Sequence, residues 1–128
     1  MIMNHRPLVC AQFHRAGELI GRRWSGAIIF LLLKSNARFA DLRAGIPGIT
    51  DRMLSERLHE LENEGICSRT VVPDAPVRVE YALTQKGRAL AQVIDSIGAW
   101  AHDWTDVASS NVPRVIAPAA MLKSGLRA

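Results

Sequence analysis

Leucines recur at helical spacing between Thr50 and Gly65, in a stretch that is otherwise rich in charge. They share one side of a helix with 3.6 residues per turn, while polar residues fall on the opposite side. Thr50 is a favourable N-cap, and Gly65 can adopt the left-handed conformation that closes a helix. The pattern predicts an amphipathic helix whose polar face serves either solvation or binding. The apolar side holds Leu54, Leu58 and Leu61, and the polar side holds Arg52, Ser55, Glu56, His59 and Asn63.

Two apolar segments precede this helix. From Val9 to Ile20 the apolar residues have helical spacing, and Gly21 can end the helix that they predict. The run from Trp24 to Leu33 is apolar on nearly all sides, which predicts a central buried helix. A run of this length is also compatible with a buried strand.

A short helix and a turn lead into the amphipathic helix. Phe39, Leu42 and Ile46 lie on one side of the short helix, and Pro47 and Gly48 enforce a turn after it. The order of short helix, turn and amphipathic helix predicts a helix-turn-helix.

The pattern changes to approximate alternation after Gly65. Residues 66–72 and 77–83 are rich in β-branched and aromatic residues, and the sequence PDAP separates them. They predict a β-hairpin with a projecting loop, because two prolines and an aspartate at the tip disfavour a two-residue turn. Cys67 begins this hairpin and is expected to pack behind the amphipathic helix.

A long helix is predicted from its N-cap, Thr84. Its apolar stripe is too long for a small core to cover, so we expect a partner subunit against part of it. The tryptophans of this helix, together with Trp24, are expected in the core rather than in an effector pocket at the interface. The stripe comprises Leu90, Val93, Ile94, Ile97, Trp100, Ala101 and Trp104.

The composition fits a single domain, since the chain has 128 residues, of which 48% are hydrophobic. We assign residues 1–108 to this domain and residues 109–128 to a C-terminal tail, with or without a short helix. The formal net charge of +4 makes a polyanionic partner plausible. The longest apolar run, from Gly26 to Leu33, is too short to cross a bilayer, and the N-terminus has no signal-peptide pattern. The protein is therefore expected to be cytoplasmic, without a membrane partner.

Residues that would suggest catalysis or a metal site are scattered. Cys10 and Cys67 lie far apart without CxxC spacing, so they predict reduced thiols rather than a disulfide framework or a zinc site. The chain has no glycine-rich phosphate loop, GxSxG or HExxH motif, which favours a protein that is not an enzyme and needs no cofactor or metal. The histidines share no short spacing; they are His5, His14, His59 and His102.

Three segments resemble the bacterial HxlR-type regulators, which are relatives of the MarR group. They are LIGRRW (19–24), RFADLRAGIPGITDRMLSERLHELENEGICSRT (38–70) and PVRVEYALTQKGRAL (76–90). The resemblance extends over roughly Cys10 to Trp104, with Ala11 where the family often has proline and GRRW where it often has GGKW. It implies a mainly α-helical winged helix-turn-helix with a small β-hairpin wing, dimeric through its N- and C-terminal helices.

The resemblance also implies a function: a transcriptional regulator that binds a pseudo-palindromic operator in double-stranded DNA as a homodimer. The helix that follows Thr50 would be the recognition helix in the major groove, and the wing would reach the adjacent backbone or minor groove. The implied DNA-binding residues are Thr50, Arg52, Ser55, Glu56, His59, Arg78 and Arg38, with Arg22 and Arg23 as weaker phosphate candidates.

Individual side chains of this surface differ in their expected roles. Arg52 is expected to contact guanine or phosphate. Glu56 repels phosphate unless it accepts a hydrogen bond from cytosine or restrains a neighbouring arginine. Arg57 lies nearer the leucines, so an internal ion pair is its expected role. A winged helix that binds only proteins is the alternative function, which salt-sensitive duplex binding would distinguish.

The terminal helices carry two further expectations. Cys10 matches the cysteine with which some HxlR-type regulators sense oxidants or electrophiles, and the dipole of the first helix would favour its thiolate. The alternative is that Cys10 is a small buried hydrophobe. The identity of an effector, either an oxidant or a small molecule, is not determined by the sequence. The residues expected at the dimer interface are Phe13, Val93, Ile97, Trp100 and Trp104.

Overall fold

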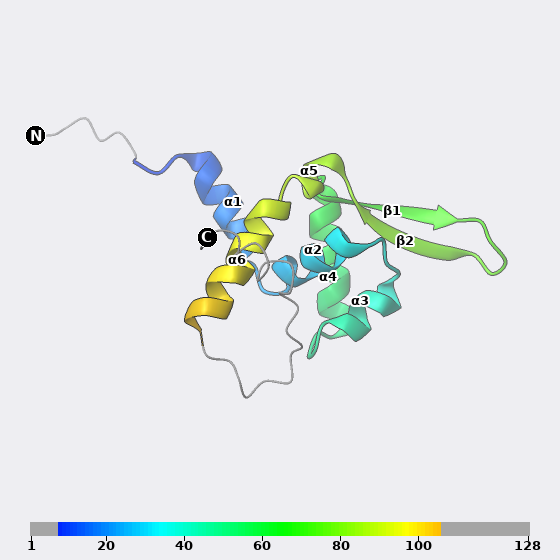
Figure 1. The fold of residues 1–128 in the computed structure, drawn as a ribbon. Coiled ribbons are helices and arrows are strands. Elements are labelled where there is room, and N and C mark those ends of the chain that lie inside the picture. Colours follow the sequence, from blue (N-terminus) through cyan, green and yellow to red (C-terminus); the bar gives the residue numbers. More distant parts are fainter. Residues whose placement is uncertain (1–7, 106–128) are drawn as a thin grey trace, which may run out of the picture.

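The computed structural model describes residues 8–105 as a mainly helical body from which a two-stranded hairpin projects (Figure 1). The expected tail at 109–128 lies outside the described residues. In chain order the elements are α1 (Ala11–Gly21), α2 (Ser25–Lys34), α3 (Phe39–Gly45), α4 (Asp51–Asn63), β1 (Cys67–Val72), β2 (Arg78–Leu83), α5 (Gln85–Arg88) and α6 (Ala91–Trp104).

The helix α4 begins and ends as its sequence predicts. The backbone N–H of Met53 donates to Thr50 Oγ1 over 3.2 Å, which satisfies one of the free donors at the start of the helix. At the other end Gly65 has φ of +75°. The N–H of Ile66 then reaches the carbonyl of Leu61 at 2.8 Å, the hydrogen bond of a Schellman cap.

The core is built around α2, which is a helix and not the alternative strand. Ile28, Ile29 and Leu32 are completely buried, and α2 contacts α1, α3, α4, α6 and β2. The predicted leucine stripe of α4 closes the core from the other side. The remaining buried hydrophobic residues are Leu42, Ile46, Ile49, Ile66, Cys67, Tyr81, Leu83 and Ile94.

The hairpin is antiparallel, with Cys67 opposite Leu83 and Val72 opposite Arg78. Its base is fixed to the body because the N–H of Ala37 donates to the carbonyl of Tyr81 at 3.0 Å and the N–H of Tyr81 donates to the carbonyl of Ala37 at 2.7 Å. The hairpin extends on the side opposite α1 (Figure 1). The helix-turn-helix, the hairpin and their order are thus confirmed.

The prediction of one long helix from Thr84 is wrong in one respect, because the segment forms two helices. Thr84 caps the short α5, its Oγ1 accepting from the N–H of Gly87 at 3.1 Å. A Cβ on Gly87 would lie 2.1 Å from the carbonyl oxygen of Ile66, so α5 packs its backbone directly against the segment that joins α4 to β1. After this contact, α6 starts as a separate helix.

The placement of aromatic residues also differs from the prediction. Trp100 and Trp104 are 62% and 76% exposed, so they are not part of the core of this chain. Trp24 is half-buried and has a left-handed backbone, with φ of +79°. Its ring lies beside Gly48 at the turn of the helix-turn-helix. Trp24 therefore packs against the core as expected, whereas Trp100 and Trp104 do not.

No helix within residues 8–105 is both long enough and apolar enough to cross a membrane.

Candidate DNA-binding surface

The polar side chains of α4 form one exposed face, opposite the buried leucines. Positions 52, 55, 56 and 59 follow the i, i+3, i+4, i+7 spacing of a single helical face, and all are exposed. Thr50 is exposed at the start of the same helix. The structure therefore brings together five of the predicted DNA-binding residues: Thr50, Arg52, Ser55, Glu56 and His59.

Arg52 and Glu56 form an ion pair on this face. Arg52 Nε lies 3.2 Å from Glu56 Oε2, and the side chain of Arg52 remains 88% exposed. One edge of the guanidinium is thus held by a carboxylate while its end faces solvent. The pair has the i, i+4 spacing at which side chains of a helix meet.

Arg57 has the internal role that the sequence predicts. Its side chain is only 12% exposed, and Nη1 lies 3.0 Å from Glu60 Oε2. Its Nε donates to the backbone carbonyl of Arg23 at 3.1 Å. Arg57 therefore ties the back of α4 to the junction between α1 and α2.

The two weaker phosphate candidates belong to the same junction. Arg22 Nη2 lies 3.3 Å from Glu60 Oε2, and the guanidinium of Arg23 lies 4.6 Å from the ring centroid of Trp24. Both cations have partners within the domain, which weakens the argument for a phosphate contact by either.

Arg43 is a structural residue of the site that sequence reasoning missed. Its Nε donates to the carbonyl of Ile49 at 2.9 Å, and Nη1 lies 2.9 Å from Asp51 Oδ1. The side chain therefore joins α3 to the first turn of α4 across the turn between them. Only the fold brings these residues together, so no local motif could have indicated the contact.

The cations of the wing differ in how they are paired. Arg78, the predicted wing contact, donates from Nε to Glu80 at 2.9 Å and also pairs with Asp74. Glu80 is the leading cause that raises the pKa of the Arg78 guanidinium. Arg69 is exposed on β1 and makes no ion pair with any residue between 8 and 105. Within the part of the chain that the structure describes, Arg69 is therefore a wing cation without an ion-pair partner, and the sequence analysis did not single it out.

Arg38 is exposed immediately before α3, where its backbone N–H donates to Asp41 Oδ2 at 3.0 Å. Its place beside the helix-turn-helix is compatible with the predicted backbone contact.

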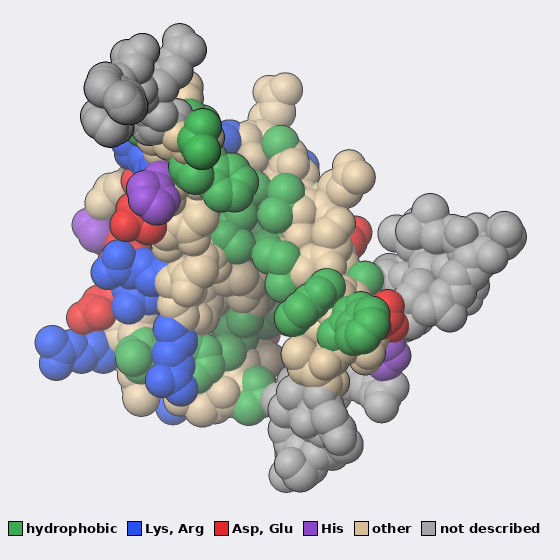
Figure 2. Space-filling model, turned by 90° about the vertical axis from the view of Figure 1, so that its left-hand side faces the viewer, with side chains coloured by type: hydrophobic (Ala, Val, Ile, Leu, Met, Phe, Trp, Pro, Cys, Tyr) green, Lys and Arg blue, Asp and Glu red, His purple; other side chains and the backbone are tan. Residues whose placement is uncertain are grey.

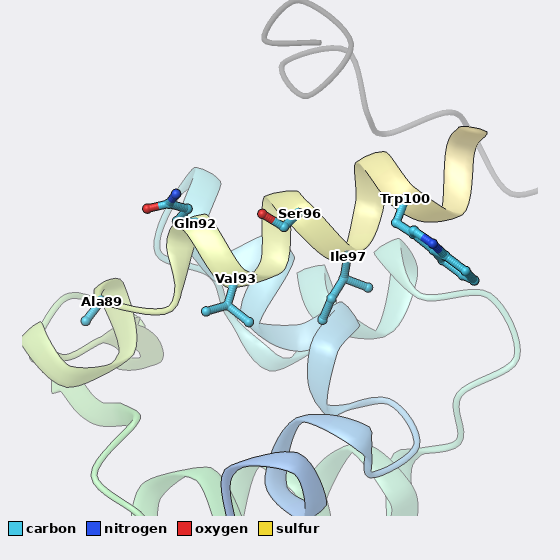
Figure 3. Close-up of a pocket in the computed structure, with 6 residues that line it drawn as sticks. All are labelled: Ala89, Gln92, Val93, Ser96, Ile97 and Trp100. Atoms are coloured by element: carbon cyan, nitrogen blue, oxygen red, sulfur yellow. The ribbon is translucent and has the colours of Figure 1, made fainter. Parts of the chain in front are cut away.

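A second surface, made by α1 and α6, is apolar and exposed. α1 has no buried residue. Figure 2 shows hydrophobic side chains gathered along this face, with charged side chains beside them. Val93, Ile97 and Trp100 project from one side of α6 and line a groove (Figure 3). The large exposed hydrophobic residues of this surface are Leu8, Val9, Phe13, Val93, Ile97, Trp100 and Trp104.

The two cysteines are in opposite environments. Cys10 is exposed, which contradicts the alternative that it is a buried hydrophobe, and it is the N-cap of α1. Its Sγ accepts from the N–H of Phe13 at 3.3 Å. Cys67 is buried beneath α4, as predicted, and burial followed by the charge of Glu62 raises the pKa of its thiol to about 11. Of the two, Cys10 is the thiol that is open to reagents.

Between residues 8 and 105, no group of three or more histidine, cysteine or acidic side chains is placed to hold a metal ion.

Comparison with known proteins gives a consistent result. The sequence profile described as HxlR-like helix-turn-helix matches residues 19–109. Over 104 residues the chain is 45% identical to the uncharacterized HTH-type transcriptional regulator YvaP of Bacillus subtilis, a match that covers 81% of this chain and 95% of YvaP. Over 98 residues it is 42% identical to the HTH-type transcriptional regulator YodB of the same organism, covering 77% of this chain and 88% of YodB.

Solved structures agree with the sequence matches. The reduced form of YodB has a TM-score of 0.70 at 41% identity, covering 77% of this chain and 97% of that chain. The redox regulator HypR in its oxidized form has a TM-score of 0.71 at 34% identity, covering 75% and 99%. The predicted resemblance and the predicted winged helix-turn-helix fold are confirmed.

Proposed function

Because this chain belongs to the HxlR-like helix-turn-helix family, we propose that it is a transcriptional regulator that binds specific sequences of double-stranded DNA. The observation that supports this most directly is the exposed polar face of α4, where Arg52 extends from a capped helix next to a wing. Such a helix fits the major groove, where side chains can read base edges. The proposed role is binding, in the cytoplasm, without catalysis, cofactor or metal.

The proposed contacts follow the geometry of the two elements. Arg52, Glu56 and Ser55 read bases or position the helix on the backbone, and His59 extends the face by one turn. Arg38 contacts phosphate beside them. On the wing, the unpaired Arg69 joins Arg78 as a backbone contact, because Arg78 is already shared between two carboxylates.

We further propose that the active species is a homodimer joined through α1 and α6. Exposed aromatic and aliphatic side chains on both helices form a surface larger than isolated surface residues require. A two-fold axis through this surface would cover it with its own copy, because a twofold interface uses the same patch on both subunits. Phe13, Val93 and Ile97 are its proposed centre, with Trp100 and Trp104 toward the end of α6.

Cys10 would allow the proposed regulator to respond to oxidants. HypR is named a redox regulator, and YodB has been solved in a reduced form. In this chain the exposed thiol of Cys10 lies at the start of α1, on the same helix as Phe13 of the proposed interface. Oxidation there to a sulfenic acid or an intersubunit disulfide would alter the dimer and thereby the spacing of its recognition helices.

The DNA-binding proposal is tested by selection from randomised duplexes, followed by titration of the selected and scrambled duplexes at several salt concentrations. We expect a selected sequence that binds at least a thousandfold more tightly than scrambled DNA, with affinity falling steeply as salt rises. Equal and weak binding to all duplexes would overturn the proposal in favour of a protein-interaction module.

The redox proposal is tested with the same selected duplex. Mild hydrogen peroxide, which can form a sulfenic acid, or diamide, which forms disulfides, is added to the wild type, Cys10→Ser and Cys67→Ser, and dithiothreitol is added afterwards. We expect the wild type and Cys67→Ser to change affinity reversibly, while Cys10→Ser does not respond. Binding that is indifferent to both oxidants in all three proteins would overturn a sensing role.

A further inference from the structure

We infer that Glu56 acts as a specificity-determining residue by favouring the orientation in which the end of the Arg52 guanidinium faces DNA, so that the pair selects guanine in preference to phosphate. The inference rests on the proposed DNA binding and adds a base preference to it. It is carried by the contact of Arg52 Nε with Glu56 Oε2 at 3.2 Å.

The geometry of the guanidinium determines which of its N–H groups remain available to DNA after this contact forms. Arginine has five N–H donors in a planar fork, one on Nε and two on each terminal nitrogen. In this structure the Nε edge is turned toward Glu56, which leaves the end of the fork, formed by Nη1 and Nη2, free. Guanine offers N7 and O6 side by side in the major groove, and an arginine binds them with two parallel hydrogen bonds. The pairing with Glu56 therefore presents the end of Arg52 that matches guanine.

Other arginines of the helix-turn-helix and wing lack this arrangement. Arg43, Arg57 and Arg78 each use both Nε and Nη1 for partners within the domain. Their forks are occupied, as expected of side chains that hold the fold together. Arg52 instead has a single partner among the described residues, on one edge of the guanidinium, and it is the more exposed member of its pair. The arrangement suits an arginine that is oriented for an external ligand.

Electrostatics supports a role in discrimination rather than in affinity. A carboxylate on the face that approaches DNA repels every phosphate, so Glu56 lowers binding to all sequences. It also occupies the Nε edge, which Arg52 would otherwise offer to a phosphate. Both effects weaken contacts with phosphate, which are the same for every sequence, more than they weaken the contact with guanine. The ratio of specific to non-specific binding therefore rises.

The test uses two substitutions of Glu56 and one matched control in the full-length protein. Glu56→Gln removes the charge but keeps an oxygen that can accept from Nε, whereas Glu56→Ala removes both. Glu62→Gln removes the same charge from the same helix at a position with no hydrogen bond to Arg52. Glutamine and alanine are both good helix formers, so circular dichroism should show the same helix content in all three variants.

Each protein is put through selection from randomised duplexes, and its affinity is measured for the selected duplex and for versions with one guanine replaced per half-site. For the wild type we expect one position at which replacing guanine is especially costly. Glu56→Ala should lower the preference for guanine at this position by roughly threefold to tenfold, part of the value of a bidentate contact, while binding scrambled DNA more tightly. Glu56→Gln should bind scrambled DNA more tightly than the wild type does, but its preference for guanine should stay within about twofold of the wild-type value. Glu62→Gln should keep the wild-type preference.

The results separate this inference from the proposed function. Unchanged guanine preference in Glu56→Ala, with specific binding intact, overturns the orienting role and leaves the proposed function standing. Loss of preference for cytosine at a neighbouring position, with guanine preference intact, overturns it in favour of direct base contact by Glu56. A wild type that selects no sequence overturns the proposed function and this inference together.

Discussion

Two arginines of α4, five positions apart, have opposite environments. Arg52 is almost fully exposed, whereas Arg57 lies against the body and contacts the carbonyl of Arg23. Five residues rotate a helix by about 500°, so the two side chains leave it on different sides. The position of a cation relative to the leucine stripe, and not its residue type, decides whether it holds the fold or is available to DNA.

Arg52→Ala should weaken binding to the selected duplex by about 1–3 kcal/mol while leaving thermal stability nearly unchanged, because an exposed side chain with one ion pair adds little to folding. Arg57→Ala is the matched comparison. It should lower the free energy of unfolding by about 1–2 kcal/mol, since it removes a nearly buried guanidinium with its hydrogen bonds to the carbonyl of Arg23 and to Glu60. Duplex titrations and thermal melts of both variants check this. An equal loss by Arg52→Ala on every duplex would make Arg52 a phosphate contact.

The buried thiol of Cys67 makes stability depend on pH. Its pKa is raised from 9.0 to about 11, so the folded chain keeps a proton that the unfolded chain has lost between these values. Stability is therefore fully present below pH 9 and falls as pH rises toward 11. Between pH 9 and 10 the thiol should contribute a loss of about 1 kcal/mol. Urea unfolding of wild type and Cys67→Ala at both pH values measures this loss of unfolding free energy. Equal pH dependence of stability in the two proteins would contradict the prediction.

At the scale of elements, the features that depend only on neighbouring residues in the sequence could be predicted. The caps of α4 at Thr50 and Gly65 and the leucine spacing between them are properties of the helix itself, and each is confirmed. The hairpin follows from alternation and from the prolines at its tip. These features need no knowledge of what packs against them.

Features that depend on packing could not be predicted in the same way. The close approach of Gly87 in α5 to the carbonyl oxygen of Ile66, in the segment between α4 and β1, joins two residues that are far apart in the sequence. The partners of Arg43 and Arg78 are likewise set by how a turn and a hairpin fold back. Trp100 and Trp104 were expected in the core because they have helical spacing, but spacing does not say whether this chain or another molecule covers them.

Ile97→Asp tests what covers α6. Ile97 is half-exposed in the single chain, so the substitution should leave the monomer folded. In a dimer it would bury an unpaired charge and weaken association by several kcal/mol. Sedimentation at micromolar concentration should show a dimer for the wild type and for the control Ile97→Val, but a monomer for Ile97→Asp. Dimers in all three proteins would place the interface elsewhere.

At the scale of the whole molecule, the two surfaces have separate tasks. The polar face of α4 and the apolar surface of α1 and α6 share no residue. Two exposed ion pairs connect the corresponding helices, Arg15 with Glu64 and Arg22 with Glu60, at 3.2 and 3.3 Å. Exposed pairs of this kind add at most about 1 kcal/mol each, so these two pairs alone do not fix the position of α1. The dimer partner would then determine how far apart two copies of α4 lie.

A symmetric dimer of this fold requires a particular spacing between the two half-sites of its DNA. Two copies of α4 related by a twofold axis should enter successive major grooves on one side of the duplex, so the half-site centres should lie about one helical turn, roughly 34 Å, or a multiple of it apart. Footprinting should show two symmetric protected half-sites. Inserting about five base pairs between them turns one half-site to the opposite side of the duplex, and affinity should fall to that of a single half-site because the second α4 can no longer engage. Protection of one half-site only, or affinity that is insensitive to the insertion, would show that the two recognition helices do not bind as a rigid pair.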